Sequence, residues 1–283
     1  MNQQTIGKSV HYSGIALHTG IRAHIDILPA PENTGIRIVR TDLEDRPEGP
    51  AIATNVVDVK RATTLAVGNS VVHTVEHVLA ALYACQIDNA IIEMNGAEPP
   101  IADGSSDAFI KMIEDAGTVE QKAEAKVCKV DKPIWIEQGE SKLVILPDDV
   151  YRISCTVKYG VNVMDTQYRS LTVTKDSFIK ELSLARTFCI YEEIEALMKA
   201  NLIKGGSLDN AVVMKGGAIF SKDGPRYPDE FVRHKMLDIV GDLSLVGCRL
   251  VGHIIAIKPG HEINVCLAQK IIKEMGLERK LNV

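Results

Sequence analysis

The order of predicted elements at the end of each half most strongly limits how this chain can fold. Residues 74–116 predict a helix, the strand "AIIEM" and a second helix, and residues 230–276 repeat that order around "IIAIK". Short runs of alternating apolar and polar residues, such as "AHIDILPA" and "SKLVILP", precede each set and are typical of strands. Because helices and strands of this kind bury their apolar faces against each other, the sequence predicts an α+β fold of two similar units.

The boundary between the two units is expected at residues 118–127, because "TVEQKAEAKV" is polar and contains no large apolar residue before Val127. We therefore predict one domain at 1–125 and a second at 126–283. A chain of 283 residues is long for one domain and natural for two. A helix and strand pair at about 187–220 have no counterpart in the first unit, so we interpret this segment as an insertion.

Charge and cysteine usage exclude several classes of protein. The net charge of −5 argues against a nucleic-acid partner, which would require a basic surface. The six cysteines form no C-x-x-C pair and are typical of buried thiols in a reducing compartment. The N-terminus has no apolar signal segment and no apolar run has the length of a membrane span. We expect a cytoplasmic monomer without an integral membrane segment.

The stretch "EFVRHKMLDIVGDL" predicts a helix with an ionisable residue at every fourth position: Glu230, His234, Asp238 and Asp242. Residues four apart on a helix lie ~40° apart around the axis, so His234 and Asp238 can bind one ion. Zinc accepts both ligand types, and a catalytic zinc usually has three protein ligands. The alternative is a solvated helix face with a local ion pair. We interpret Glu230 as part of a solvated first turn.

The fragment "HTVEHVLAAL" offers a third ligand, His77, at the start of another helix. Its neighbour Glu76 lies ~100° around that helix, where it can reach a water at the metal instead of the ion. A glutamate beside a metal ligand acts as general base in H-E-x-x-H hydrolases. The alternative is a histidine bonded to the preceding loop, beside a glutamate favoured by the helix dipole.

A further histidine, His261 in "IKPGHEIN", follows a predicted strand and a Pro-Gly turn, and we expect it on a loop, where functional residues are common. Asp242, one turn beyond Asp238, can hold this imidazole and keep it protonated. The alternative is a surface histidine and an unrelated helix-end aspartate. His18 lies at a glycine-flanked turn and stays ambiguous, whereas four histidines in strand-like contexts have no predicted role: His11, His24, His73 and His253.

Several fragments occur together in the order and at the spacing of one family: "GIALHTG", "TVEHVLAAL", "PIADGSS", "ARTFCI", "KGGSLDNAVV", "EFVRHKMLDIVGDL" and "PGHEIN". From about residue 5 to 275 the sequence resembles the UDP-3-O-acyl-N-acetylglucosamine deacetylases, zinc hydrolases of lipid A (lipopolysaccharide) biosynthesis. The resemblance implies two β-α-α-β sandwich domains that face each other across the active site, with a βαβ-type insert in the second. It also implies release of acetate from the UDP-sugar.

The resemblance implies roles for particular residues. His77, His234 and Asp238 would bind one Zn²⁺ per chain, Glu76 would be the general base, and His261, oriented by Asp242, would be the acid for the leaving amine. Thr187 would hold the oxyanion. The implied substrate contacts are Phe188 with the sugar, Lys235 and Lys258 with the diphosphate, Tyr159 with uracil, and Ile194, Ile203, Ser207, Ala211 and Val213 with the acyl chain. We expect Lys235 to face the cleft rim. His18 and Asp103 match family positions to which we assign no role.

Three alternatives stay open from the residues alone. Two histidines and a carboxylate also bind the iron of non-haem oxygenases, although that chemistry gives no role to Glu76 or His261. Fe²⁺ can replace Zn²⁺ in the same hydrolysis. A nucleotide-sugar binding protein without turnover would need no acid or base residues.

Overall fold

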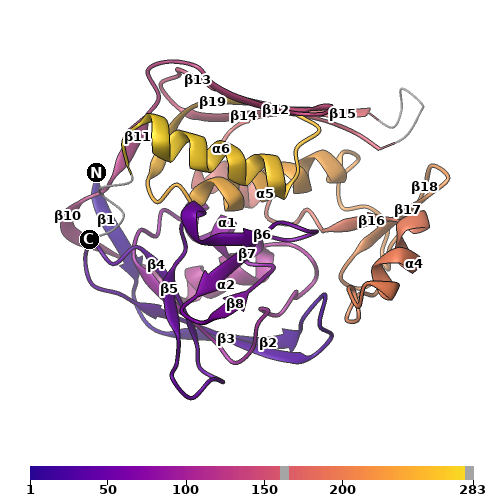
Figure 1. Cartoon of the computed structure of the whole chain (residues 1–283), viewed down its shortest axis with the longest axis horizontal. Coiled ribbons are helices and arrows are strands. Elements are labelled where there is room, and N and C mark those ends of the chain that lie inside the picture. Colours follow the sequence, from indigo (N-terminus) through magenta and orange to yellow (C-terminus); the bar gives the residue numbers. More distant parts are fainter. Residues whose placement is uncertain (160–165, 278–283) are drawn as a thin grey trace.

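The computed structural model describes residues 1–159 and 166–277, and two mixed sheets form its outer layers with helices of both halves between them (Figure 1). The first sheet consists, in spatial order, of β2 (Val10–Ile15), β3 (Arg22–Pro29), β9 (Ala90–Met94), β4 (Ile36–Arg40) and β5 (Glu48–Pro50). The second sheet consists of β12 (Ile134–Gln138), β13 (Ser141–Leu146), β19 (Arg249–Ile257), β14 (Tyr151–Lys158) and β15 (Thr166–Thr172), with β11 (Val127–Lys129) also beside β19.

The two sheets share one topology. In each, the central strand, β9 or β19, is antiparallel to one neighbour and parallel to the other. Alternate residues of β19 are buried, because one face of the strand packs on helices, as its sequence pattern predicts. The predicted α+β fold of two similar units, each a sheet on helices, is confirmed, and the position of the domain boundary stays a prediction.

The inner layers are α1 (Glu76–Ala84) and α2 (Asp107–Ala116) from the first half, and α5 (Glu230–Ser244) and α6 (His261–Glu274) from the second. Helices α1 and α5 pack against each other at the centre. A Cβ atom at Gly241 of α5 would lie 2.2 Å from the carbonyl oxygen of Glu76, so only glycine permits this close approach. The contact brings the first turn of α1 onto the middle of α5.

The predicted insertion forms a small sheet of its own. Strand β16 (Phe188–Ile190) continues into α4 (Tyr191–Lys199) and returns as β17 (Val212–Lys215), parallel to β16. Strand β18 (Ala218–Phe220) then pairs antiparallel with β17. The expected βαβ-type insert is therefore confirmed, and it lies at one end of the molecule, to the right in Figure 1. The short helix α3 (Lys175–Glu181) precedes it.

Three local expectations differ from the structure. The polar segment expected as a linker forms β10 (Thr118–Glu124), which pairs with β1 (Asn2–Ile6) in a two-stranded ribbon; an exposed ribbon needs no large apolar residues. Helix α1 begins at Glu76 rather than at Thr74, whose φ of 59° is incompatible with a right-handed helix. Helix α6 begins at His261, so the expectation that this histidine lies on a loop is wrong.

The remaining elements pack beside the first sheet and the helices. They are the 3-10 helix η1 (Ala53–Asn55) and a three-stranded sheet of β6 (Val56–Asp58), β7 (Thr64–Val67) and β8 (Ser70–Val72). Among the described residues, no helix is both long enough and apolar enough to cross a membrane.

Candidate active site

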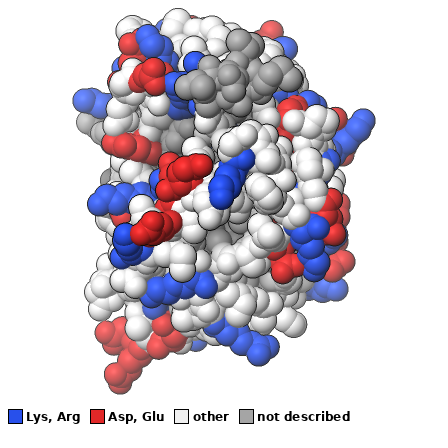
Figure 2. Space-filling view, turned by 90° about the vertical axis from the view of Figure 1, so that its right-hand side faces the viewer, with Lys and Arg blue, Asp and Glu red and all other residues white. Residues whose placement is uncertain are grey.

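A cavity of about 410 Å³ lies where the first turns of α1 and α6, the middle of α5 and strand β16 meet. Its lining includes nine of the residues singled out in the sequence: Glu76, His77, Tyr159, Thr187, Phe188, His234, Lys235, Asp238 and His261. Figure 2 looks onto the end of the molecule that carries the insert, where acidic and basic side chains are interspersed around uncharged surface.

Three buried side chains in this cavity can hold one metal ion. The ligand atoms of His77, from α1, and of His234 and Asp238, from α5, all lie within 4.8 Å of one another. Asp238 Oδ1 is 3.4 Å from His234 Nε2 and 3.9 Å from His77 Nε2. Tetrahedral zinc with bonds of 2.0–2.2 Å separates its ligand atoms by about 3.3 Å. The three side chains are therefore spaced as ligands of one ion.

The protonation of the three groups also fits a metal. His234 Nδ1 lies 3.0 Å from the carbonyl oxygen of Ala185 and donates to it, which leaves the Nε2 lone pair for an ion. Burial, followed by the proximity of His234, lowers the pKa of His77 to about 3, and burial likewise lowers the pKa of His234. Although burial opposes ionisation, His234 and Lys235 hold the pKa of Asp238 well below its usual range.

Two buried polar atoms of the cluster, Asp238 Oδ1 and His77 Nδ1, have no hydrogen-bond partner among the described residues. An unsatisfied buried carboxylate oxygen such as Asp238 Oδ1 is costly. The other oxygen of the same side chain, Oδ2, accepts from the ammonium of Lys235 at 2.7 Å. The unpartnered oxygen is the one that lies toward both imidazoles, so a cation between the three side chains would satisfy it.

Glu76 and His261 differ in pKa, so that one can accept a proton and the other can donate one near neutral pH. Burial raises the pKa of Glu76 to about 7, and one of its oxygens accepts from the backbone N–H of Thr63 at 3.1 Å. His261 Nδ1 lies 3.0 Å from Asp242 Oδ2. Although burial opposes its charge, the carboxylates of Asp242 and Glu76 raise the pKa of His261 to about 9. Near neutral pH the cavity thus contains a base close to its pKa and a cationic acid.

Comparison with known proteins agrees with this geometry. A family model described as "UDP-3-O-acyl N-acetylglycosamine deacetylase" matches residues 3–273. The chain belongs to this family. Proteins named UDP-3-O-acyl-N-acetylglucosamine deacetylase from Chlamydia felis and from Geobacter sp. strain M21 are 44% and 42% identical to it. The alignments cover 96% of this chain in both cases, and 98% and 89% of the respective relatives.

Membership of the deacetylase family makes the chain a metal-dependent hydrolase of an amide bond and confirms the resemblance seen in the sequence. It removes the oxygenase and the binding protein without turnover as alternatives. The identity of the metal and the roles of individual residues stay predictions. For those residues the structure supplies positions, which agree with some of the expectations and correct others.

The deacetylase cavity has an aromatic wall. The ring centroid of Phe188 lies 4.9 Å from that of Tyr159 and 4.6 Å from that of Phe231, and Phe188 and Tyr159 both line the cavity. Thr187 also lines it, and its backbone N–H donates to the carbonyl oxygen of Gly104 at 2.7 Å. This bond fastens the start of the insert to the first half of the chain, and the oxyanion role of Thr187 stays a prediction.

The two lysines predicted for the diphosphate lie differently from expectation. The ammonium of Lys235 is bonded to Asp238 inside the cavity, so the expectation that this group faces the rim is wrong. Residues three apart on a helix are neighbours on its surface, and this spacing brings the Lys235 and Asp238 side chains together. Lys258 is not among the cavity-lining residues, and its ammonium lies 2.6 Å from a carboxylate oxygen of Glu140. Contact of either lysine with a diphosphate stays a prediction.

The five residues predicted for the acyl passage lie in the insert and not on the wall of this cavity. Ser207 is exposed, and the other four are half-buried: Ile194, Ile203, Ala211 and Val213.

Two residues have no assigned role, His18 and Asp103. His18 is buried, and its Nδ1 lies 3.4 Å from the backbone nitrogen of Ile203. Asp103 forms an ion pair with Arg226.

Glu230 is a clear correction. We expected a solvated side chain, but Glu230 is 2% exposed and pairs with the equally buried Arg186 at 2.8 Å. It also accepts from the backbone N–H groups of Arg186 and Arg226, so it holds the segment before the insert onto the start of α5. The four-residue spacing places Glu230 on the same helix face as His234. That face is buried, so the spacing already indicated that Glu230 is buried too.

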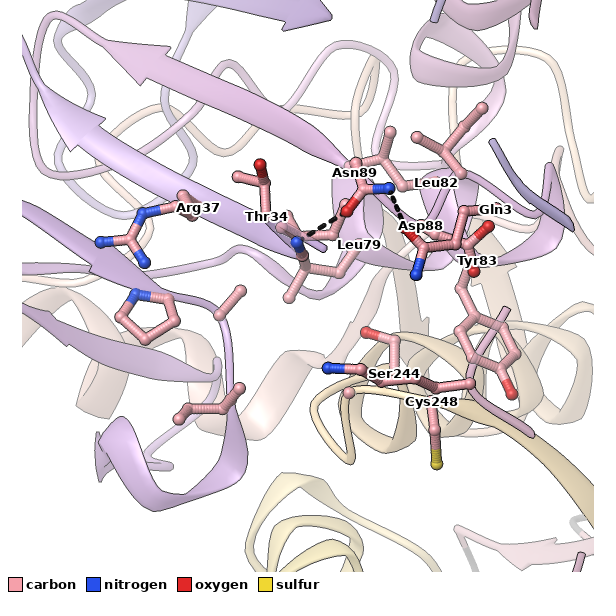
Figure 3. A pocket seen from close by; sticks show the side chains of 18 of the residues that line it. Gln3, Thr34, Arg37, Leu79, Leu82, Tyr83, Asp88, Asn89, Ser244 and Cys248 are labelled. Carbon is pink, nitrogen blue, oxygen red and sulfur yellow. Dashed lines mark hydrogen bonds between the residues drawn. The ribbon is translucent and has the colours of Figure 1, made fainter. Parts of the chain in front are cut away.

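A second cavity, of about 150 Å³, lies between the two halves at the other end of α1. Figure 3 shows that the Asn89 side chain is already bonded within it, accepting from Gly35 N and donating to Gln3, each at 2.8 Å. Ser244 and Cys248 lie on its opposite wall. None of the predicted site residues lines this cavity.

Proposed function

We propose that the chain hydrolyses UDP-3-O-acyl-N-acetylglucosamine to UDP-3-O-acyl-glucosamine and acetate, an early step of lipid A biosynthesis. Family membership supports the substrate class. The observation that carries the proposal is the unpartnered Asp238 Oδ1 beside the two imidazoles of His77 and His234. It lies in one cavity with the acid and base that amide hydrolysis needs.

His77, His234 and Asp238 would hold zinc, and bound zinc acts as a Lewis acid that polarises the amide carbonyl and acidifies water. Imidazole and carboxylate ligands also suit Fe²⁺, which is the alternative metal for the same reaction. The ligand set alone favours neither ion strongly.

The protein groups then divide the proton transfers. Glu76 removes a proton from the attacking water, for which a pKa of about 7 is suited. His261, protonated near neutral pH, donates a proton to the departing nitrogen, which would otherwise leave poorly. Asp242 holds the imidazolium through Nδ1, and Thr187 on the cavity wall supplies a donor toward the oxyanion.

The substrate body would occupy the rest of the cleft. Phe188 would pack on the sugar and Tyr159 on uracil, with Lys235 and Lys258 near the diphosphate and the half-buried apolar residues of the insert along the acyl chain. Action as a cytoplasmic monomer belongs to the same proposal. The described residues contain no disulfide, which supports a reducing compartment.

Acetate release from UDP-3-O-acyl-N-acetylglucosamine, measured together with metal content, tests this function. We expect turnover that a chelator abolishes and added metal restores. Glu76→Gln should lower kcat by at least about 100-fold while the metal content stays near one per chain. Tight binding of the substrate without chelator-sensitive turnover would refute the proposal, and loss of metal in Glu76→Gln would show that the role of Glu76 is wrong.

A further inference from the structure

Thr63 contacts both proton-transfer groups of the site although it does not line the cavity. It lies directly before β7 in the first half of the chain and is completely buried. Its backbone N–H donates to Glu76 Oε2 at 3.1 Å, and its hydroxyl donates to Asp242 Oδ1 at 2.6 Å. One residue is therefore bonded to the predicted general base and to the carboxylate that holds the predicted acid.

The hydroxyl of Thr63 fixes the rotation of the Asp242 carboxylate. That carboxylate is fully buried and accepts three hydrogen bonds from side chains of the described residues. His261 Nδ1 and Asn264 Nδ2 both bond to Oδ2, at 3.0 and 2.9 Å, whereas Thr63 bonds to Oδ1. A carboxylate is planar, so a donor on Oδ1 also determines where Oδ2 points. Without it, the group could rotate away from His261.

The Thr63 bond also joins the two halves of the molecule at the site. Asp242, His261 and Asn264 all come from α5 and α6 of the second half, whereas Thr63 and Glu76 come from the first. The hydroxyl also lies 3.5 Å from His261 Nδ1, at the limit of a hydrogen bond. Thr63 thus sets the position of the acid relative to the base across the interface between the halves.

We propose that Thr63 is a positioning residue that aligns the Asp242–His261 pair with Glu76 through its hydroxyl, an inference that rests on the proposed function. A hydrogen bond to a buried charged group is stronger than a neutral one, and its loss leaves Asp242 Oδ1 without that donor. Thr63 acts on the proton transfers and not on the substrate, so kcat and not KM should respond.

Two substitutions with opposite chemistry separate this role from packing. Thr63→Val keeps the branched shape and removes the hydroxyl, whereas Thr63→Ser keeps the hydroxyl and removes a methyl group. We expect Thr63→Val to lower kcat about 10- to 100-fold with KM within about twofold, and Thr63→Ser to stay within about threefold of the wild type. Thr64→Val is the matched control, because Thr64 is a half-buried neighbour at the start of β7, and should behave as the wild type.

Two further measurements make the test specific. If Thr63 acts through Asp242, Thr63→Val should cost little more in an Asp242→Asn background, because effects of residues that act as a unit are not additive. In ¹⁵N-labelled protein, Thr63→Val should shift the Nδ1 resonance of His261, whereas Thr64→Val should not. If Thr63→Val does not fold, Thr63→Ala replaces it against Thr63→Ser.

The inference is overturned if Thr63→Ser loses as much activity as Thr63→Val, if the two losses are additive with Asp242→Asn, or if Thr63→Val loses its metal. An unshifted His261 resonance would overturn it as well. Failure of the proposed function is distinguishable, because the wild type would then release no acetate while the His261 resonance still responded to Thr63→Val.

Discussion

Replacing Gly241 by alanine should separate the two helices that carry the proposed metal ligands. The added Cβ would lie 2.2 Å from the carbonyl oxygen of Glu76 and 2.9 Å from its carbonyl carbon. Both atoms belong to the backbone, so no side-chain rotation can relieve the overlap. To reach an ordinary contact, α1 and α5 must move apart by roughly 1 Å, which displaces His77 from the pair on α5.

The expected cost can be divided between activity and stability. A misplacement of about 1 Å at a reacting centre lowers the rate by about 100-fold, so kcat should fall by that order although Gly241 does not line the cavity. Overpacking costs about 1–3 kcal/mol, and alanine regains up to about 1 kcal/mol of helix propensity over glycine. The net loss of unfolding free energy should therefore be small, about 0–2 kcal/mol, and the loss of activity large.

Acetate release, metal titration and thermal unfolding of Gly241→Ala measure these effects. Gly96→Ala is the matched control, because a Cβ at Gly96 would meet only the Cδ1 atom of Ile21, at an ordinary contact distance of 3.4 Å. We expect Gly241→Ala to bind metal more weakly and the control to bind it normally. A Gly241→Ala variant with kcat within about threefold of the wild type and unchanged metal affinity would refute this prediction, since the helices would then have accommodated the methyl group without moving the proposed ligands.

Three further predictions follow from the charges of the site. Activity should rise with pH as Glu76 loses its proton near pH 7 and fall as His261 loses its proton near pH 9, so a profile of kcat/KM that is flat from pH 6 to 10 would contradict the assigned pair. Chelation should lower the unfolding temperature measured by calorimetry, because an ion bound only by the folded state stabilises it, and zinc should restore it; an unchanged temperature would mean that no ion binds. Glu230→Ala should reduce the free energy of unfolding by about 3–5 kcal/mol in denaturant titration, because it leaves the buried guanidinium of Arg186 uncompensated. A reduction below about 1 kcal/mol is the size expected for a solvent-exposed ion pair and would contradict the burial of this one.

Much of the fold follows from local pattern. The recurring helix–strand–helix order predicted two similar units, and both sheets have the same strand topology. The period of the helix also placed His234 and Asp238 on one side, where their ligand atoms lie 3.4 Å apart. These inferences succeed because α-helical and β-strand periods are short-range geometry that the sequence displays directly.

The position of the charged atoms could not be inferred in that way. The helical pattern predicted on which face of the helix Lys235 lies, but it did not predict that the Lys235 ammonium bonds to Asp238. It predicted that Glu230 lies in the first turn of the helix, but it did not predict the ion pair with Arg186 that buries this side chain. Nothing in "KRATTLAV" distinguishes Thr63 from Thr64, because the contacts of Thr63 with Asp242 and Glu76 exist only after the two halves dock.

The sequence by itself determined the kinds of elements, their order and the residue types that can carry metal-dependent hydrolysis. The tertiary structure alone decided that His77 from α1 lies beside the pair on α5 and that Asp238 Oδ1 has no hydrogen-bond partner among the described residues. It also decided that the pKa of Glu76 lies below that of His261. The physical reason is that burial and the approach of distant charges set these properties, and both depend on how closely α1 and α5 pack at Gly241.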